Sequence, residues 1–429
     1  MTFRSIIANI ILLLAFFSVA AQNKRTDTFY LLQPARVFDG ESVHEGWQVL
    51  IKNNRIEAAG DLKNIPKDAI RIDLKGCTLL PGMIEGHSHL FLHPYNETTW
   101  DEQVLNESRA ERTSRAVNHA YSTLMAGFTT VRDLGTEGAG YDDAGLKTAI
   151  EKGIIPGPSM LIATRAIVAT GSYGPKSGVA ETDFPKGAAE AGNIEELSRE
   201  IRTQIGKGAD IIKLYADYRW GINNEPEPTF TEQELLAAVQ LTSASGRPVV
   251  AHASTLEGMR RSAMAGVSTI EHGDDGTPEI FALMKEKGVA LCPTLSAGEA
   301  TEQYKGWNKS TSPETQRLIN KRKSFAAALA AGVTICMGGD VGVFAHGDNA
   351  REMEMMVKYG MKPIDVLRSA TSVNADVFKI NKTVGRIRPG LQADIIAVDG
   401  NPVTNISDIR KVRLVMKKGW IYSGRKKTD

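Results

Sequence analysis

Two histidines separated by one residue, His87 and His89, are the first residues of the chain whose types and spacing could do chemistry. They end an apolar run that starts at Leu80. On a β-strand, alternate side chains share a face, so the two imidazoles would lie roughly 6.5 Å apart along the chain and could converge on one cation. Neutral imidazole nitrogens are ligands of zinc-like ions. The pair alone leaves open two solvent-facing histidines at a strand end.

Four more residues of ligand type end strand-like runs: Lys213, His252, His272 and Asp340. Each has a structural alternative, because the histidines could be hydrogen-bonded at strand ends and Asp340 could cap the next helix. Lys213 has the weakest alternative. Its run, from Ala209 to Tyr215, would bury it, and a buried ammonium is costly unless it is paired or loses its proton.

Eight strand-like runs, alternating with helical stretches, would position these residues. Eight such strands are typical of an α/β fold of the TIM type, a (β/α)8 barrel, in which the carboxyl ends of all strands meet at one mouth. An open doubly wound sheet usually carries a glycine-rich turn after its first strand, where this chain has His-Ser-His. The eight runs are residues 82–89, 127–133, 159–163, 210–215, 248–252, 268–272, 289–294 and 333–340.

Short alternating strands flank this region on both sides, which predicts one small all-β sandwich domain built from both ends of the mature chain. The expected boundaries are residues 22–80 and 381–429 for the sandwich and residues 81–380 for the barrel.

Residues 1–21 have the pattern of a secretory signal peptide, with Arg4 before an apolar run that small residues follow. The run is shorter than the ~20 residues that span a bilayer, so we expect a secreted or periplasmic protein whose mature form has no membrane partner.

The composition excludes several classes of partner. The 429 residues are 42% hydrophobic and carry a net charge of +1, which gives no electrostatic bias toward nucleic acid. Cys77, Cys292 and Cys336 are an odd number for a disulfide framework, and we expect buried thiols with one optional bridge at most. A homo-oligomer remains open, because both the sandwich and the barrel helices could form interfaces.

With these residues in place, the chain resembles the amidohydrolase superfamily, and within it the imidazolonepropionase-like and Xaa-Pro-dipeptidase-like branch. Besides the six ligand-type residues, the resemblance includes residues 78–82, 127–133 and 385–401. It implies two divalent metal ions, with zinc favoured by the ligand types and Mn or Co able to substitute. The implied ligands are His87, His89 and Asp340 for one metal, His252 and His272 for the other, and a carbamate on Lys213 that bridges both.

The resemblance also implies a mechanism without a protein nucleophile. Two metals would activate a bridging hydroxide, and Asp340 would take its proton and pass it to the leaving amine. In residues 170–174, Tyr173 stands where the family has a histidine. We therefore expect Tyr173 to be the oxyanion donor, or the loop to be recast for another substrate.

A substrate carboxylate is expected to meet residues of the loop that follows Lys213, with Arg219 able to form a bidentate pair. A surface loop is the alternative for these residues. His346 matches a His-Gly of the family and could bind substrate or order its own loop. The candidate substrate-binding residues are Tyr215, Tyr218, Arg219 and His346.

We therefore expect a metal-dependent hydrolase of amide bonds that acts on dipeptides, in the manner of Xaa-Pro dipeptidases, or on N-acyl amino acids. A cyclic-amide hydrolase or deaminase is less well matched, because relatives of that kind lack the bridging lysine and carry Glu where Thr255 stands. A metal-dependent binding protein without catalysis is the third reading, and the presence of Asp340 weighs against it.

Overall fold

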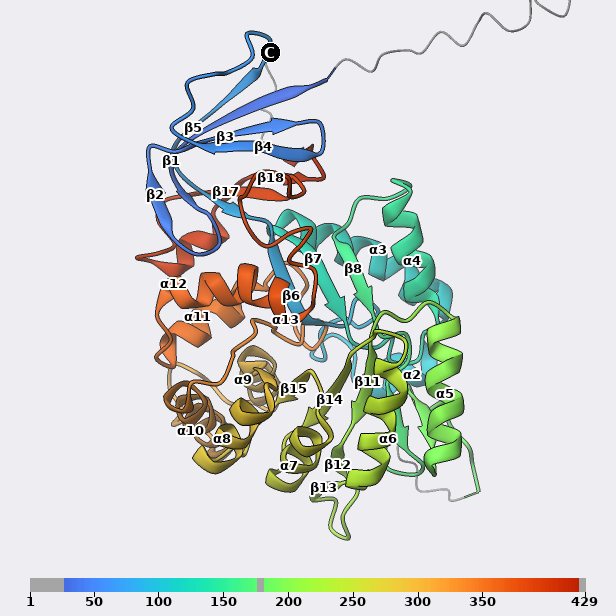
Figure 1. Cartoon of the computed structure of the whole chain (residues 1–429). Helices are drawn as coiled ribbons and strands as arrows, with labels where there is room; N and C mark the ends of the chain where they lie inside the picture. Colours follow the sequence, from blue (N-terminus) through green and yellow to red (C-terminus); the bar gives the residue numbers. More distant parts are fainter. Residues whose placement is uncertain (1–26, 176–180, 424–429) are drawn as a thin grey trace, which may run out of the picture.

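The computed structural model describes residues 27–175 and 181–423. The predicted signal peptide, residues 1–21, lies outside the described residues. Within the described part of the chain, no helix is both long and apolar enough to cross a membrane. Figure 1 shows a region of β-strands packed against a larger region in which helices and strands are mixed.

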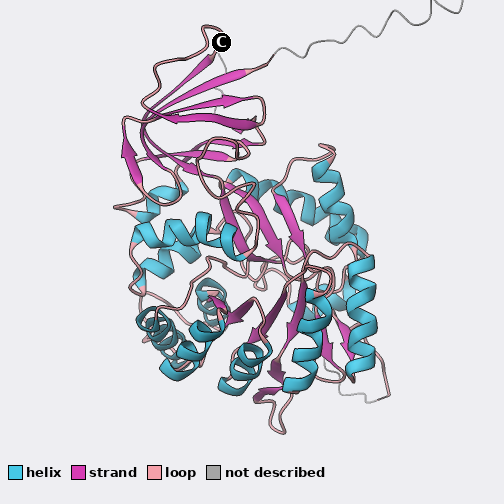
Figure 2. Ribbon diagram, in the orientation of Figure 1, coloured by secondary structure: helices cyan, strands magenta, loops and turns pink. Residues whose placement is uncertain are grey.

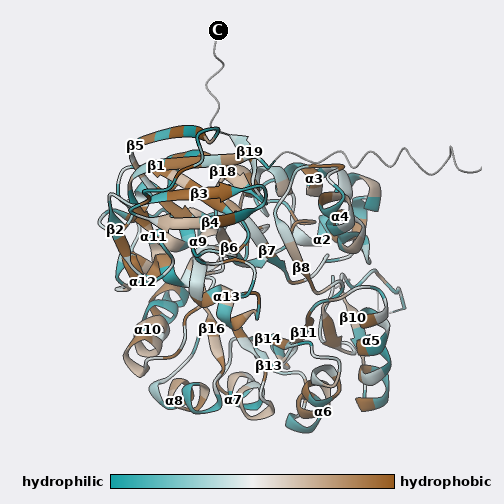
Figure 3. Ribbon diagram, turned by 45° about the horizontal axis from the view of Figure 1, so that its top comes forward, coloured by the Kyte–Doolittle hydropathy of each residue, from teal (hydrophilic) through white to brown (hydrophobic). Residues whose placement is uncertain are grey.

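An eight-stranded sheet joins strands from the two ends of the described chain (Figures 1 and 2). Its central strand, β5 (Ile70–Pro81), pairs in parallel with β1 (Phe29–Phe38) and antiparallel with β17 (Ile395–Asp399). Leu79, Ile395 and other apolar residues of both ends form one core, and Figure 3 shows hydrophobic stretches along β1, β3 and β5. The remaining strands are β2 (Val43–Glu45), β3 (Gln48–Lys52), β4 (Arg55–Gly60), β18 (Val412–Lys417) and β19 (Trp420–Ser423).

The mixed α/β region contains two sheets of parallel strands, in the orders β6-β7-β8 and β10-β9-β11-β14-β15-β16. Strands occur in the first seven of the eight predicted runs. They are β6 (Met83–Ser88), β7 (Phe128–Asp133), β8 (Ser159–Ile162), β11 (Ile212–Tyr215), β14 (Val249–Ala253), β15 (Thr269–His272) and β16 (Ala290–Cys292). The additional short strands are β9 (Ile167–Ala169), β10 (Ala189–Ala191), β12 (Asp217–Arg219) and β13 (Pro226–Pro228).

Helices follow most of these strands, and Figure 2 shows them around the outside of the strands. Several begin at a threonine whose hydroxyl accepts a backbone N–H of the first turn, as Thr231 and Thr255 do. The helices are α2 (Trp100–Asn106), α3 (Arg109–Met125), α4 (Asp142–Glu151), α5 (Ile194–Gly206), α6 (Glu232–Ser243), α7 (Leu256–Ala265), α8 (Pro278–Lys287), α9 (Leu295–Tyr304), α10 (Gln316–Ala331), α11 (Ala350–Lys358), α12 (Pro363–Arg368) and α13 (Asn374–Val377).

The prediction of a regular eighth strand at residues 333–340 is wrong. Only isolated parallel bridges form there, at Ile335 and Val341. Gly338 explains part of the irregularity, because its backbone lies so close to β6 that a Cβ atom would sit 2.7 Å from the His87 nitrogen. Asp340 adds to it with a left-handed φ of 60°, which interrupts an extended strand. The segment still hydrogen-bonds to both neighbours, through Cys336 N–H to Leu291 O and Gly86 N–H to Met337 O.

The thiol prediction is confirmed for all three cysteines, which are buried and unpaired. Burial raises the pKa of the Cys77 thiol to about 11 and that of Cys336 to about 12. These thiols therefore stay protonated at neutral pH and behave as apolar side chains of the core.

A stability prediction follows from the turn between β18 and β19, where Gly419 has a φ of 76° and meets the turn that contains Asn53. A Cβ atom at Gly419 would overlap the Asn53 carbonyl oxygen, so Gly419→Ala should lower the melting temperature by several degrees. Gly46→Ala is the matched control, because Gly46 has a φ of 71° with no atom near its missing Cβ. It should show only the backbone effect, about 1–2 kcal/mol. Equal losses in thermal unfolding would contradict the packing argument.

Candidate metal centre and substrate cavity

The two histidines of the first strand reach the same carboxylate. His87 lies on β6 and His89 just after it, with imidazole centroids 5.3 Å apart. Their Nε2 atoms lie 3.6 and 3.3 Å from Asp340 Oδ1, respectively. The structure thus brings these three predicted ligands together, although Asp340 follows His87 by some 250 positions in the sequence.

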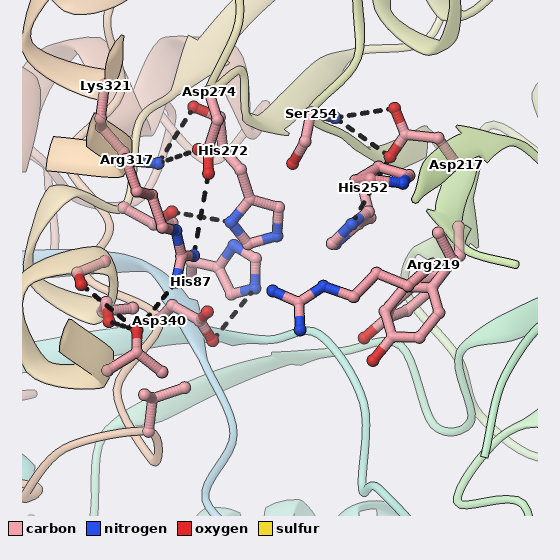
Figure 4. A pocket seen from close by; sticks show the side chains of 18 of the residues that line it. His87, Asp217, Arg219, His252, Ser254, His272, Asp274, Arg317, Lys321 and Asp340 are labelled. Carbon is pink, nitrogen blue, oxygen red and sulfur yellow. Dashed lines mark hydrogen bonds and ion pairs between the residues drawn. The ribbon is translucent and has the colours of Figure 1, made fainter. Parts of the chain in front are cut away.

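His252 and His272 come from adjacent parallel strands, β14 and β15, and their ring centroids lie 4.4 Å apart. The His272 ring is also 5.2 Å from the His87 ring. Atoms of His87, His272 and Asp340 lie within 4.8 Å of one another, a spacing that can hold a metal ion. The four predicted histidine ligands therefore surround one space, which Figure 4 shows from close by for His87, His252 and His272.

Burial keeps three of these imidazoles neutral. It lowers the pKa of His87 to about 4 and that of His252 to about 3, and it lowers the pKa of His272 well below its usual value. The nearby charge of Lys213 acts in the same direction. A neutral imidazole has a free nitrogen lone pair, which is the form that binds metal. His89 differs: burial acts to lower its pKa, but Asp340 outweighs burial and raises the pKa to about 9, so a metal would have to displace a proton from this imidazole. With that exchange, the donor set fits divalent transition metals.

Lys213, on β11, is fully buried, and its Nζ has no hydrogen-bond partner among the described residues. The Nζ lies 5.4 Å from the centroid of the Tyr215 ring. Burial lowers the pKa of this amine. An amine that is buried without a hydrogen-bond partner and has a lowered pKa is a candidate for chemistry.

Asp340 follows two glycines and has a left-handed φ of 60°. Burial would raise the pKa of its carboxyl group, but the neighbouring His87 and His89 outweigh this effect and lower it. The side chain is therefore a carboxylate that faces the space between the histidines. In this position it can bind a cation or accept a proton.

Sequence reasoning missed the residues that orient these ligands. Glu271 Oε2 accepts the Nδ1 hydrogen of His87 at 2.8 Å, and Arg132 donates to the other oxygen of Glu271 at 2.8 Å. Thr294 Oγ1 lies 2.7 Å from His272 Nδ1. In each case Nδ1 is occupied, so Nε2 is left for the cavity; hydrogen bonds of this kind fix the orientation of histidine ligands in metal sites. The adjacency of Glu271 to His272 in the sequence was the available signal for the first of these.

A cavity of about 570 Å³ opens in front of the histidines and is lined by all the predicted ligands except the fully buried Lys213. Predicted substrate-binding residues line it as well: Tyr215, Tyr218 and Arg219. Tyr215 stacks on His252 with centroids 4.6 Å apart. Figure 4 shows Arg219 reaching into the pocket from one side and Arg317 and Lys321 from the other.

Tyr173 also lines the cavity, but its hydroxyl donates to Glu137 Oε2 at 2.6 Å. Burial raises the pKa of this phenol well above its usual value, and the charge of Glu137 adds to the effect. The hydroxyl hydrogen is thus directed at a carboxylate. This geometry does not favour the expected role of Tyr173 as an oxyanion donor and agrees better with a recast loop.

His346 is not among the cavity-lining residues. Its ring stacks on His119 with centroids 4.3 Å apart, and its Nε2 donates to Leu92 O at 3.0 Å. These contacts fit the second of the two readings given for His346, in which it orders its own loop.

The side of the cavity formed by α10 was not predicted. Lys321 forms an ion pair with Asp274 and also donates to His272 O at 3.4 Å. Arg317 Nη2 lies 3.8 Å from Asp274 Oδ2. No strand-end pattern marks these residues, because Arg317 and Lys321 lie on a helix whose orientation the sequence alone does not give.

Known proteins resemble this chain in sequence and in fold. Residues 78–421 match the model of the Amidohydrolase family. The chain is 29% identical to ochratoxinase of Aspergillus niger over 425 residues, which covers 90% of this chain and 84% of the ochratoxinase.

Among solved structures, a Xaa-Pro dipeptidase with bound methionine in its active site is 32% identical and superposes with a TM-score of 0.83, covering 92% of this chain and all of the dipeptidase. A prolidase complexed with N-methylphosphonate-L-proline is 26% identical and has a TM-score of 0.78, covering 93% of this chain and all of the prolidase.

The contact between Thr294 and His272 generates a test of ligand orientation. Thr294→Val removes the hydroxyl at nearly constant volume and should weaken metal binding about tenfold, because His272 Nδ1 loses its partner. Thr294→Ser keeps the hydroxyl and should bind metal close to the wild-type affinity. Both affinities can be measured by titrating zinc into protein whose metal a chelator has removed. If the valine variant bound as well as the serine variant, Thr294 would have no part in positioning His272.

Proposed function

This chain belongs to the amidohydrolase family and is a hydrolase of carbon–nitrogen bonds, and we propose that it cleaves the amide bond of a dipeptide or an N-acyl amino acid at a centre of two divalent metal ions. The unpaired, buried amine of Lys213 is the single observation that carries the binuclear part of the proposal. A neutral amine can add to carbon dioxide, forming an N–C bond and releasing one proton. The resulting carbamate is an anion of the kind that two cations stabilise.

The proposed ligands are His87, His89 and Asp340 for one ion and His252 and His272 for the other, with carboxylated Lys213 between them. Zinc suits imidazole and carboxylate donors. The ions, when bound, supply a water of lowered pKa and polarise the scissile carbonyl. Glu271 holds His87 in the tautomer whose Nε2 faces the cavity.

The chain's own proton transfer falls to Asp340. Its carboxylate is ionised and faces the space between the histidines, so it can accept a proton there. The same oxygen can then deliver that proton to the leaving amine. Arg219, at the cavity wall, is the proposed partner of the substrate carboxylate, and Tyr218 lines the same wall.

The substrate class rests on likeness to a Xaa-Pro dipeptidase and a prolidase, and on the cationic Arg219 in the cavity. The cyclic-amide alternative is disfavoured because Thr255 caps α7 where those relatives carry Glu. A silent binding protein is disfavoured because Asp340 is ionised and suitably placed.

We also propose a closed (β/α)8 barrel and a separate all-β domain, in a protein that is exported. Support for closure comes from backbone hydrogen bonds between the two parallel sheets: Asp210 N–H to Ile162 O, Cys336 N–H to Leu291 O and Gly86 N–H to Met337 O. Support for the all-β domain comes from the core shared by strands of both chain ends. Support for export rests on the sequence pattern of residues 1–21 alone.

The direct experiment is to load the purified protein with zinc in bicarbonate buffer, measure its metal content and screen a library of dipeptides and N-acyl amino acids. We expect about two metals per chain and hydrolysis of members of the library. One metal per chain would refute the binuclear centre. Turnover of cyclic amides alone would favour the alternative.

Asp340→Asn tests the proton transfer. Asparagine keeps an oxygen for the metal but cannot accept the proton, so turnover should fall about a hundredfold to ten-thousandfold while most of the metal is retained. The matched control is Asp274→Asn, since Asp274 lines the same cavity but already pairs with Lys321. The Asp274→Asn control should lose much less turnover than Asp340→Asn. Near-normal turnover of Asp340→Asn would require another base.

Lys213 can be tested by rescue. Lys213→Ala should lose most of its metal, and a short-chain carboxylic acid in solution should restore part of it by occupying the vacated space. Lys213→Arg is the matched control, because a permanently charged guanidinium fills that space and cannot become an anion. Metal content, measured by elemental analysis, is the readout. A Lys213→Arg variant with two metals would rule out the carbamate.

A further inference from the structure

We propose that Glu137 binds the α-ammonium group of a dipeptide substrate, so that the enzyme selects substrates with a free amino terminus over N-acyl amino acids without one. This inference rests on the proposed amide hydrolase function and narrows its substrate class. It concerns a residue that no pattern in the sequence singled out and that serves neither the metal ligands nor the proton transfer.

Glu137 lies next to the metal centre. It lines the cavity, and its backbone has a left-handed φ of 48° in a loop between glycines. The side chain folds back over Gly135, because a Cβ atom built there would lie only 3.2 Å from Glu137 Oε1. The carbonyl of Gly135 in turn accepts the Nδ1 hydrogen of His89 at 2.9 Å. The carboxylate is therefore close to a proposed metal ligand.

The carboxylate receives only neutral hydrogen-bond donors among the described residues. Tyr173 OH and Trp100 Nε1 donate to Oε2 at 2.6 and 3.0 Å, and Tyr215 OH donates to Oε1 at 3.4 Å. No Lys or His nitrogen of the described residues lies within ion-pair distance of it, although the charges of Lys213 and His89 interact with it at longer range. Arg112, the nearby cation, donates instead to the backbone oxygen of Glu137 at 2.6 Å.

A buried carboxylate whose oxygens have no cationic donor is unfavourable, and a carboxylate has about four acceptor positions, of which these donors use three. The remaining position belongs to Oε1, whose hydrogen bond from the Tyr215 hydroxyl is the longest of the three. An ammonium group at the cavity wall would supply both the missing charge and the missing donor. This would make the interaction a charge-assisted hydrogen bond, which is stronger than a neutral one.

Aromatic rings form the cavity wall beside the Glu137 carboxylate. Tyr173, Tyr215 and Tyr218 pack with centroids 4.7 to 5.8 Å apart beside Glu137. Aromatic faces attract cations, and this attraction adds to that of the carboxylate. Burial, reinforced by the charge of Glu137, raises the pKa of Tyr218 to about 12, so the phenol stays neutral. The wall therefore favours a cation over an anion.

The cavity carries side chains of both signs of charge, as the two charged groups of a dipeptide require. In a dipeptide the α-ammonium is attached to the carbon next to the scissile carbonyl, whereas the carboxylate belongs to the leaving amino acid. Glu137 sits beside the ligand His89, and Arg219 reaches in from β12. One anionic and one cationic side chain thus fit the two ends of a zwitterion. An N-acyl amino acid would leave Glu137 without a partner.

The experiment compares two substrates that differ only in this group: Phe-Pro and its des-amino analogue, 3-phenylpropanoyl-proline. The ratio of their kcat/KM values is measured for the zinc-loaded wild-type enzyme, for Glu137→Gln and for Tyr173→Phe. The wild type should prefer Phe-Pro by more than tenfold. Glu137→Gln should reduce that ratio about tenfold or more, because the charge is lost while the shape is kept. Tyr173→Phe removes a donor but leaves the charge, and should keep the preference.

Three outcomes would overturn the inference. The first is a wild-type enzyme that prefers the des-amino substrate, a result that needs no variant to fold. The second is a Glu137→Gln enzyme that slows both substrates equally, which would make Glu137 a support for the tyrosines. The third is a wild-type enzyme that hydrolyses neither substrate nor any other amide, in which case the proposed function itself has failed.

Discussion

Desolvation of the Lys213 amine is the constraint on which the rest of the site depends. The strand β11 carries this amine into an interior where nothing among the described residues hydrogen-bonds to its nitrogen. The same burial keeps the imidazoles of His87, His252 and His272 neutral. One physical effect therefore favours the uncharged form of both kinds of ligand, the amine of Lys213 and these three imidazoles. Because burying these polar groups without partners is unfavourable, we infer that metal cations and the carbamate anion complete the site.

Around this interior, the fold supplies fixed partners to the ligands. Arg132 orients Glu271 and stabilises its negative charge, and Glu271 orients His87. Thr294 faces His272, and the Gly135 carbonyl faces His89. These three imidazoles thus have Nδ1 occupied, which limits ring rotation and keeps their Nε2 atoms directed at one space. Such a preorganised set loses little entropy when it binds an ion.

Much of the centre could be predicted from the sequence, because period-two spacing and strand ends are local signals. The apolar runs mark the strands that carry His87, His252 and His272 and the strand that His89 follows directly, and the structure brings the four together. The prediction of a regular eighth strand was wrong because Gly338 approaches β6 too closely and the Asp340 backbone has a left-handed conformation. Glu137 and Arg317 were missed because a loop and a helix carry them to the cavity, and tertiary packing alone decides their direction. His346 was assigned to the site by resemblance to the family, but it donates to Leu92 O and does not line the cavity.

The central claim is that two metal ions share a carboxylated Lys213. A crystal structure of the zinc-loaded protein, grown in bicarbonate buffer with anomalous data collected at the zinc edge, tests it most directly. The account predicts two anomalous peaks about 3.5–4 Å apart, with continuous density from Lys213 Nζ to a planar group between them. A single peak bound by histidines, with Lys213 unmodified, would contradict it.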